Sequence, residues 1–137
     1  MHKIFFCFFL SLCLNVFAHP DSVSKKYSDE LAHLPSPLPD RVVLTWNDDP
    51  ASTQAVNWRT DTSVLEGVAQ IAIANSNGRT LNPTEFKAET TYFKSDINEA
   101  HYHSVIFRNL KSDTLYAYRV GDGVNWTEYY HFKTASS

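Results

Sequence analysis

Gly121-Asp122 is one candidate pair of residues whose types and spacing could support chemistry. It ends an apolar stretch and precedes several aromatic residues. A carboxylate at the end of a strand can bind a metal ion that activates water for hydrolysis. The same pair, followed by Gly123, also fits a tight turn, because glycine adopts positive φ angles that other residues avoid. We predict the turn, so that Asp122 is structural.

Histidines form the second candidate group. His101 and His103 are two residues apart, so on a β-strand both side chains point to one face and could reach one metal ion. His131 could supply a third ligand of the type that zinc prefers. In the alternative arrangement, which we predict, His103 lines the sheet beside Val105 while His101 and His131 are solvated.

The remaining polar residues form no recognisable catalytic set. Asp48-Asp49 and Asp21 do not make a second carboxylate shell, and we predict a solvated turn at Asp48-Asp49. The sequence has no Gly-x-Ser-x-Gly nucleophile elbow and no glycine-rich phosphate loop before a helix. It therefore assigns no catalytic, cofactor-binding or metal-binding residue.

The elements that must position these residues are short β-strands, because no stretch has a sustained helical period. Aromatic and β-branched residues alternate with polar ones from Val42 onward, and turn residues separate the segments. Asn77-Gly78 predicts a hairpin, while Lys87 and Glu89 suit an edge strand. We predict about seven strands, within residues 41–46, 54–60, 67–78, 84–93, 101–107, 114–121 and 128–134.

The predicted core has one feature more specific than alternation. Trp46 shares one face of the first strand with Val42 and Leu44, and Trp58 is expected to point inward from the second strand. Tyr116 and Tyr118 share one face of a later strand. Leu110 and Tyr116 flank "KSDTL", which matches a tyrosine corner, where a buried tyrosine hydroxyl bonds to upstream backbone. The mature chain would lack a disulfide, and the tryptophan lies on the second strand. These features predict an all-β, antiparallel β-sandwich of the fibronectin type III-like class.

The N-terminal residues indicate export. Residues 1–18 combine Lys3, a short apolar run and Ala18 at the end, as a secretory signal peptide does. The run is shorter than the roughly 20 apolar residues that span a bilayer. Cys7 and Cys13 both lie within it, so the exported chain would contain neither cysteine nor disulfide. We expect a secreted protein, extracellular or periplasmic, with no membrane contact after cleavage.

Residues 19–38 are predicted to be a proline-rich linker ahead of a domain spanning residues 39–136. Removal of Lys3 with the signal changes the balance from 12 basic and 15 acidic residues to 11 and 15, a net charge of −4. No basic stripe remains, so we expect no nucleic-acid partner. Asn125-Trp126-Thr127 is a glycosylation acceptor if the host glycosylates secreted proteins.

Two segments resemble the N-terminal domain of purple acid phosphatases. They are "PDRVVLTWNDDPASTQAVNWRT" and "HSVIFRNLKSDTLYAYRVGDGVNWTEYYHFKTAS", and the resemblance runs from about Pro39 to Ser136. Its specific elements are Leu44-Thr45-Trp46 with Asp49-Pro50, Val56-x-Trp58-x-Thr60, Tyr116-x-Tyr118-Arg119-Val120-Gly121, and His131-Phe132-Lys133-Thr134.

The resemblance implies a family of secreted metallophosphoesterases that hydrolyse phosphate monoesters at a dinuclear, iron-containing metal centre. In this family the metal ligands lie in a second, C-terminal α/β domain, in motifs such as Gly-Asp-x-x-Tyr, Gly-Asn-His and Gly-His-x-His. Here Asn125 stands where Gly-Asp-x-x-Tyr has its tyrosine, and Ala100 replaces the glycine of Gly-His-x-His. We therefore expect no cofactor in this chain.

The resulting expectation is a secreted accessory domain that is inactive alone. Its partner would be a catalytic metallophosphoesterase domain that is missing here and is supplied in cis or as a separate chain. One alternative is a free-standing β-sandwich that binds a protein or glycan through loops or a sheet edge. Another is a small metal-binding protein built on the histidines.

Overall fold

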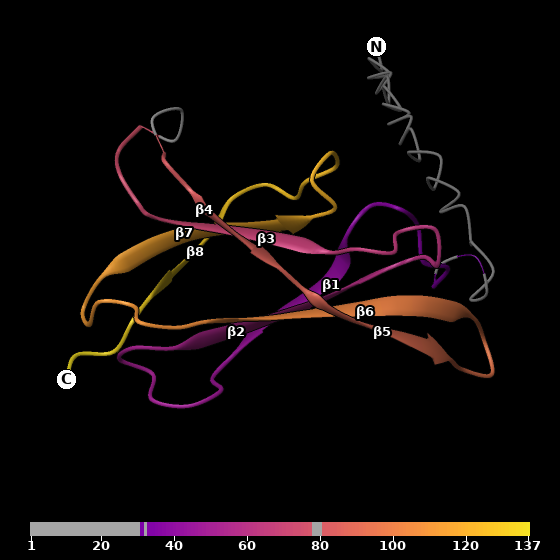
Figure 1. Cartoon of the computed structure of the whole chain (residues 1–137), viewed down its shortest axis with the longest axis horizontal. Coiled ribbons are helices and arrows are strands. Elements are labelled where there is room, and N and C mark those ends of the chain that lie inside the picture. Colours follow the sequence, from indigo (N-terminus) through magenta and orange to yellow (C-terminus); the bar gives the residue numbers. More distant parts are fainter. Residues whose placement is uncertain (1–30, 32, 78–80) are drawn as a thin grey trace, which may run out of the picture.

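The computed structural model describes residue 31, residues 33–77 and residues 81–137. These residues form eight strands in two four-stranded antiparallel sheets that pack face to face (Figure 1). The predicted signal peptide, Asp21 and most of the predicted linker lie outside the described residues. No helix in the described part of the chain is long and apolar enough to cross a membrane.

The strand order confirms the predicted antiparallel, fibronectin type III-like β-sandwich, with eight strands instead of about seven. The first sheet contains, in spatial order, β1 (Asp40–Thr45), β2 (Gln54–Thr60), β6 (Glu99–Phe107) and β5 (Glu89–Lys94). The second contains β4 (Thr84–Lys87), β3 (Val68–Ile73), β7 (Leu115–Gly121) and β8 (Tyr130–Lys133).

The additional strand arises because residues 84–93, predicted as one strand, form two strands in different sheets. β4 pairs with β3, and β5 pairs with β6. Between them, the Ala88 N–H donates to the Gly67 carbonyl at 2.8 Å, and the chain crosses from one sheet to the other (Figure 1). Both strands lie at sheet edges, as the charges of Lys87 and Glu89 indicate. Gly78 of the predicted Asn77-Gly78 hairpin is outside the described residues.

The core lies between the sheets and is built from alternate, inward-facing positions. Trp58 is 1% exposed, and the register of β2 against β6 places Val56 beside Val105 and Trp58 beside His103. Burial of the large apolar surface of Trp58 removes it from water, and this burial stabilises the folded state. The buried cluster comprises Val56, Trp58, Ala69, Ile71, Val105, Phe107, Tyr116, Tyr118, Val120 and Phe132.

Trp46 does not lie in this core, although alternation places it on one face with Val42 and Leu44, which pack against the core. The strand β1 ends at Thr45, and Trp46 is 75% exposed. At this point the Gln54 side chain donates from Nε2 to the Thr45 carbonyl at 2.8 Å, and the chain turns toward β2. Alternation assigns a face only while the strand continues, so it fails one residue beyond the end.

The described part of the predicted linker is hydrogen-bonded to the sandwich. The His33 carbonyl accepts hydrogen bonds from Arg59 Nη1 and from Asn98 Nδ2, each at 3.2 Å. The Ser36 carbonyl accepts another from the Asp61 N–H at 2.9 Å. These contacts hold residues 33–36 against the end of the sandwich at which β2 finishes and β6 begins.

Candidate functional site

The carboxylate of Asp122 is used inside its own turn. Its Oδ1 accepts hydrogen bonds from the backbone N–H groups of Val124 at 2.8 Å and Asn125 at 2.6 Å. Its Oδ2 accepts another from the Asn125 side chain at 3.0 Å. Gly123 has a φ of 93°, and a Cβ at Gly121 would lie 2.0 Å from the Asn125 carbonyl oxygen. The two glycines are therefore required by the turn geometry.

The electrostatics of Asp122 agree with this structural role. Its partial burial raises the pKa of the carboxyl, but the hydrogen bonds from Asn125 and from the backbone N–H groups together lower that pKa below its ordinary value. Within the described residues, no group of three or more His, Cys, Asp or Glu side chains is arranged to hold a metal ion. Asp122 thus acts as a charged acceptor for the turn.

His103 is buried between the two sheets and is 1% exposed. Its Nε2 lies 2.8 Å from Thr60 Oγ1, and its Nδ1 lies 2.9 Å from Thr90 Oγ1. The Trp58 ring stacks on the imidazole, with the ring centroids 5.2 Å apart. Both ring nitrogens are engaged by threonine hydroxyls, and neither is directed at a free space where a metal ion could bind.

The charge state of His103 follows from this environment. Burial, with a smaller contribution from nearby His101, lowers the pKa of His103 from 6.5 to about 4, because the charged imidazolium loses its hydration. The side chain is therefore neutral at neutral pH. A neutral imidazole can accept from one threonine and donate to the other, which satisfies both ring nitrogens.

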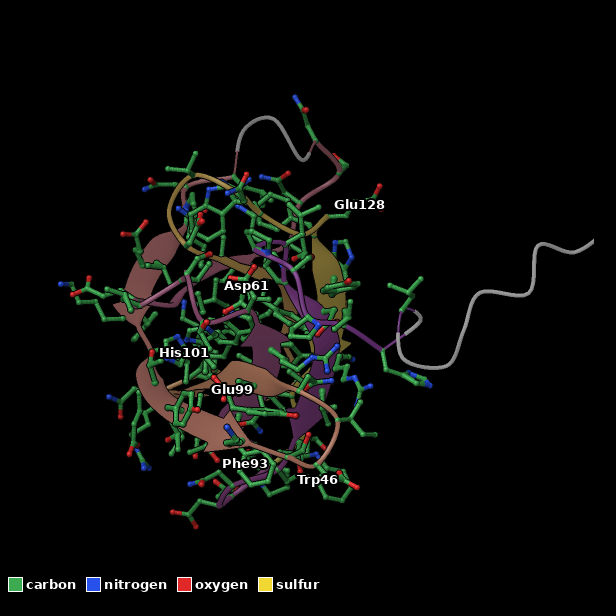
Figure 2. All side chains as sticks on the ribbon, turned by 90° about the vertical axis from the view of Figure 1, so that its right-hand side faces the viewer. Trp46, Asp61, Phe93, Glu99, His101 and Glu128 are labelled. Atoms are coloured by element: carbon green, nitrogen blue, oxygen red, sulfur yellow. The ribbon has the colours of Figure 1, made fainter. Side chains whose placement is uncertain are left out.

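The three histidines do not assemble into one site. His101 does share a face with His103, with ring centroids 6.3 Å apart, but its Nδ1 lies 2.7 Å from the Val64 carbonyl oxygen. His101 and Glu99, both labelled in Figure 2, belong to β6. His131 is exposed on β8 of the other sheet, opposite Ala117. The predicted lining role of His103 agrees with this placement, whereas His101 is half-buried and hydrogen-bonded instead of solvated.

Asp48-Asp49 lies in the turn between β1 and β2, where Asp49 holds the backbone. Its Oδ1 accepts from the Ala51 N–H at 3.0 Å, and its Oδ2 accepts from the Ser52 hydroxyl at 2.8 Å. The hydrogen bond from Ala51, followed by that from Ser52, lowers the pKa of Asp49. This carboxylate is engaged in the turn, as Asp122 is in its own.

The glycosylation acceptor Asn125 lies in the surface turn after β7. Its Nδ2 donates to Asp122 Oδ2, and the Thr127 hydroxyl oxygen accepts a hydrogen bond from the Val120 N–H at 3.2 Å. The side chain of Asn125 is half-buried. Its modification stays a prediction.

Of the five structural residues proposed from the sequence, four lie in or against the core and Trp46 is exposed. Tyr116 accepts a hydrogen bond at its hydroxyl from the Lys111 N–H at 2.9 Å, which is the contact that a tyrosine corner makes. Leu110 packs against the buried cluster, and Tyr118 is part of that cluster. Trp58 also belongs to the cluster, while Trp46 is exposed.

One buried polar contact has no signal in the sequence. Arg59 lies on the outer face of the first sheet, yet it is only 3% exposed. It donates from Nε to Asp40 Oδ1 at 2.8 Å and from Nη2 to Asp40 Oδ2 at 2.5 Å, so the pair is bidentate. The hydrogen bond to Asp40 raises the pKa of Arg59. The two residues are 19 positions apart, and only the pairing of β1 with β2 brings them together.

A second feature that sequence reasoning missed is an open groove beside Trp46. It has a volume of about 400 Å³ and lies where the first strand of one sheet approaches the last strand of the other. Trp46 projects from the periphery of the molecule in Figure 2. The lining residues are Leu44, Thr45, Trp46, Gln54, Phe132 and Lys133.

Solved structures similar to this chain include modules of larger proteins. The fn3 domain of human contactin 1 is 17% identical over 75% of this chain and 81% of its own, with a TM-score of 0.49. The chicken CNTN1 FN1-FN3 domains are 17% identical over 74% of this chain, with a TM-score of 0.48, and this chain spans 31% of their length. Astrotactin-2, a vertebrate-specific, perforin-like membrane protein, is 15% identical over 73% of this chain and 22% of its own, with a TM-score of 0.50.

The family comparison is more specific than these structural likenesses. No curated protein matches the chain. The family model described as "Purple acid Phosphatase, N-terminal domain" matches residues 39–134, which include all eight strands. This sandwich, with its tyrosine corner and its closed Gly-Asp turn, therefore belongs to the purple acid phosphatase N-terminal domain family.

Proposed function

We propose that this chain is a secreted, non-catalytic accessory domain of a purple acid phosphatase-like metallophosphoesterase. The catalytic domain would be supplied by another segment, in cis or as a separate chain. The observation that carries the proposal is the family match over residues 39–134 to an N-terminal domain. The engagement of Asp122 and His103 in structural hydrogen bonds supports the accessory role.

The chemistry of the family supports this division of labour. Hydrolysis of a phosphate monoester needs metal-bound hydroxide, neutralisation of the phosphoryl oxygens and a proton donor for the leaving group. The uncatalysed reaction is so slow that enzymes accelerate it by up to ~10²¹-fold. The candidate residues do not fit a two-metal centre, because His131 is on the opposite sheet from His101 and His103, and Asp122 is bound within its turn.

Activity measurements on the chain collected from a secreting host test the proposal. Loaded with iron, zinc or manganese, the chain is expected to hydrolyse a chromogenic phosphate ester no faster than the metal alone. Turnover that survives purification and disappears in His103→Gln or Asp122→Asn would contradict the accessory role. The N-terminal residue of the secreted protein checks export, with His19 expected after signal cleavage.

The genomic sequence that follows the codon of Ser137 provides a second test. An in-frame or adjacent segment encoding Gly-Asp-x-x-Tyr and Gly-Asn-His is expected, since these are motifs of the family's catalytic domain. A locus without any metallophosphoesterase sequence would instead favour a free-standing binding module.

One observation favours that second candidate function. Phe93 and Tyr102 lie on the outer face of the first sheet, with ring centroids 5.9 Å apart, and both remain exposed. With Thr91 they line a shallow, almost wholly apolar depression of about 370 Å³. Exposed aromatic residues of this kind are frequent in protein–protein interfaces.

A further inference from the structure

The chain is firmly held where it leaves the last strand. Thr134 is 3% exposed, and its hydroxyl donates to the Lys111 carbonyl at 2.6 Å and accepts from the Thr114 N–H at 3.0 Å. The Ala135 N–H donates to the Pro50 carbonyl at 3.1 Å, and the Ala135 carbonyl accepts from the Asp113 N–H at 3.0 Å. The end of β8 is therefore attached to both the β1–β2 turn and the β6–β7 connection.

These attachments place the end of β8 beside the groove that contains Trp46. Phe132 and Lys133, the last residues of β8, line that groove together with Leu44 and Trp46. We call this surface the exit groove; it comprises Leu44, Thr45, Trp46, Gln54, Phe132 and Lys133. Figure 1 shows the C-terminus next to the β1–β2 turn, at the opposite end of the sandwich from the β5–β6 turn.

The turn that follows Trp46 is held by hydrogen bonds. Asp49 accepts five of them through its side chain and its carbonyl, from Ala51, Ser52 and Thr53. The Ser52 carbonyl accepts a further hydrogen bond from the Leu110 N–H at 2.9 Å, which attaches the turn to the β6–β7 connection between the two sheets. Trp46 is exposed between the paired end of β1 at Thr45 and this hydrogen-bonded turn.

A large aromatic side chain that is exposed beside a hydrogen-bonded turn has the properties of a binding anchor. Tryptophan buries a large apolar area on docking and has few rotatable bonds, so little conformational entropy is lost. Residues that dominate binding energy are enriched in tryptophan and are surrounded by contacts that add little energy but exclude water. Here the ion pair between Lys133 and Asp113, at 2.6 Å, lies exposed at the border of the groove.

The family match indicates the occupant of the groove. The matched model is an N-terminal domain, so a domain that follows it would leave the sandwich from the end of β8. That end is anchored through Ala135 and lies beside the groove. The depression at Phe93 and Tyr102 lies near the beginning of β6, away from the β6–β7 connection that holds the exit.

We propose that the exit groove, with Trp46 as its anchor, is the surface on which the catalytic metallophosphoesterase domain docks. This inference rests on the proposed function. The partner surface inserts an apolar or aromatic side chain beside the indole of Trp46, and the border near Lys133 and Asp113 remains polar. Docking buries Trp46 and holds the two domains in one relative orientation.

The test uses the full chain and the metallophosphoesterase domain encoded at the same locus, produced as a separate chain. The dissociation constant is measured by calorimetry for the wild type, for Trp46→Ala and for the matched control Phe93→Ala. Phe93 is a suitable control because it is also an exposed aromatic residue, at 53%, but lies on β5 next to the β5–β6 turn, at the other end of the sandwich (Figure 1). We expect at least tenfold weaker binding for Trp46→Ala and a change of less than twofold for Phe93→Ala.

Two further measurements separate the outcomes. The melting temperature of Trp46→Ala is expected to match that of the wild type, because Trp46 contributes little to the core. Equal affinities for the wild type and Trp46→Ala would overturn the exit groove as the docking surface and leave the proposed function intact. The absence of a metallophosphoesterase domain at the locus, or its failure to bind the wild type, would overturn both the proposed function and this surface.

Discussion

Lowering the pH from 7 to 4.5 is expected to destabilise the folded chain, because His103 becomes protonated in the unfolded state but stays mostly neutral in the folded state. In the folded state, burial and then nearby His101 lower the pKa of this imidazole from 6.5 to about 4. In the unfolded state the imidazole is hydrated and titrates near 6.5. Between these values the unfolded chain binds more protons than the folded chain, so the free energy of unfolding falls as the pH falls.

The magnitude follows from the difference between the two pKa values. A lowering from 6.5 to about 4 corresponds to about 3 kcal/mol when the pH is below both values, and most of this loss, roughly 2–3 kcal/mol, occurs between pH 7 and pH 4.5. Domains of this size are stable by about 5–15 kcal/mol, so the effect is a large fraction of the total. The ring is 1% exposed, so water screens it little.

Urea denaturation followed by circular dichroism at half-unit pH steps measures this dependence. The wild type is compared with His103→Gln, which cannot be protonated, and with His131→Gln, which removes an exposed histidine. The pKa values of Asp49 and Asp122 are lowered from 3.8 and that of Glu99 from 4.5, so the stability that these carboxylates contribute begins to be lost only near the lower end of this pH range. The comparison with His103→Gln, which retains these carboxylates, isolates the histidine.

The dependence of the free energy of unfolding on pH is compared among the three proteins. The wild type and His131→Gln should lose stability in parallel, whereas His103→Gln, although less stable at pH 7, should show a flatter profile. If His103→Gln retained the full pH dependence of the wild type, the acid sensitivity would arise elsewhere and the reasoning about His103 would be refuted.

Three further predictions concern the core and its independence from metal. Tyr116→Phe should lower the free energy of unfolding by about 1–2 kcal/mol in a urea titration, because the Lys111 N–H loses its partner at 2.9 Å; a neutral result would contradict the tyrosine corner. Gly67→Ala should lower it by about 1–3 kcal/mol, because the added Cβ would lie 2.6 Å from the His103 ring and 2.8 Å from the Trp58 ring; an unchanged midpoint would show that these rings can shift freely. Addition of a chelator should leave the thermal melting curve unchanged, and a large drop in the melting temperature would revive a histidine metal site.

The sequence alone determined the parts of this protein that depend on local patterns. Alternation identified the strand segments and the inward-facing Trp58, Tyr116 and Tyr118, because neighbouring side chains on a strand point to opposite faces. Short spacings predicted the hydrogen bond of Tyr116 and the turn at Gly121-Asp122, in which partners lie within five residues. These features are decided by backbone geometry over a few residues.

Tertiary structure decided the features that depend on strand ends and on pairing. Alternation continues through Ala88, so it does not reveal that the chain changes sheets there, and it does not show that β1 ends before Trp46. The contacts of His103 with Thr60 and Thr90 join three strands, and the pairing of Arg59 with Asp40 joins two. Such contacts require a particular register between strands distant in sequence, and register is set by the packing of the whole sandwich and not by any one segment.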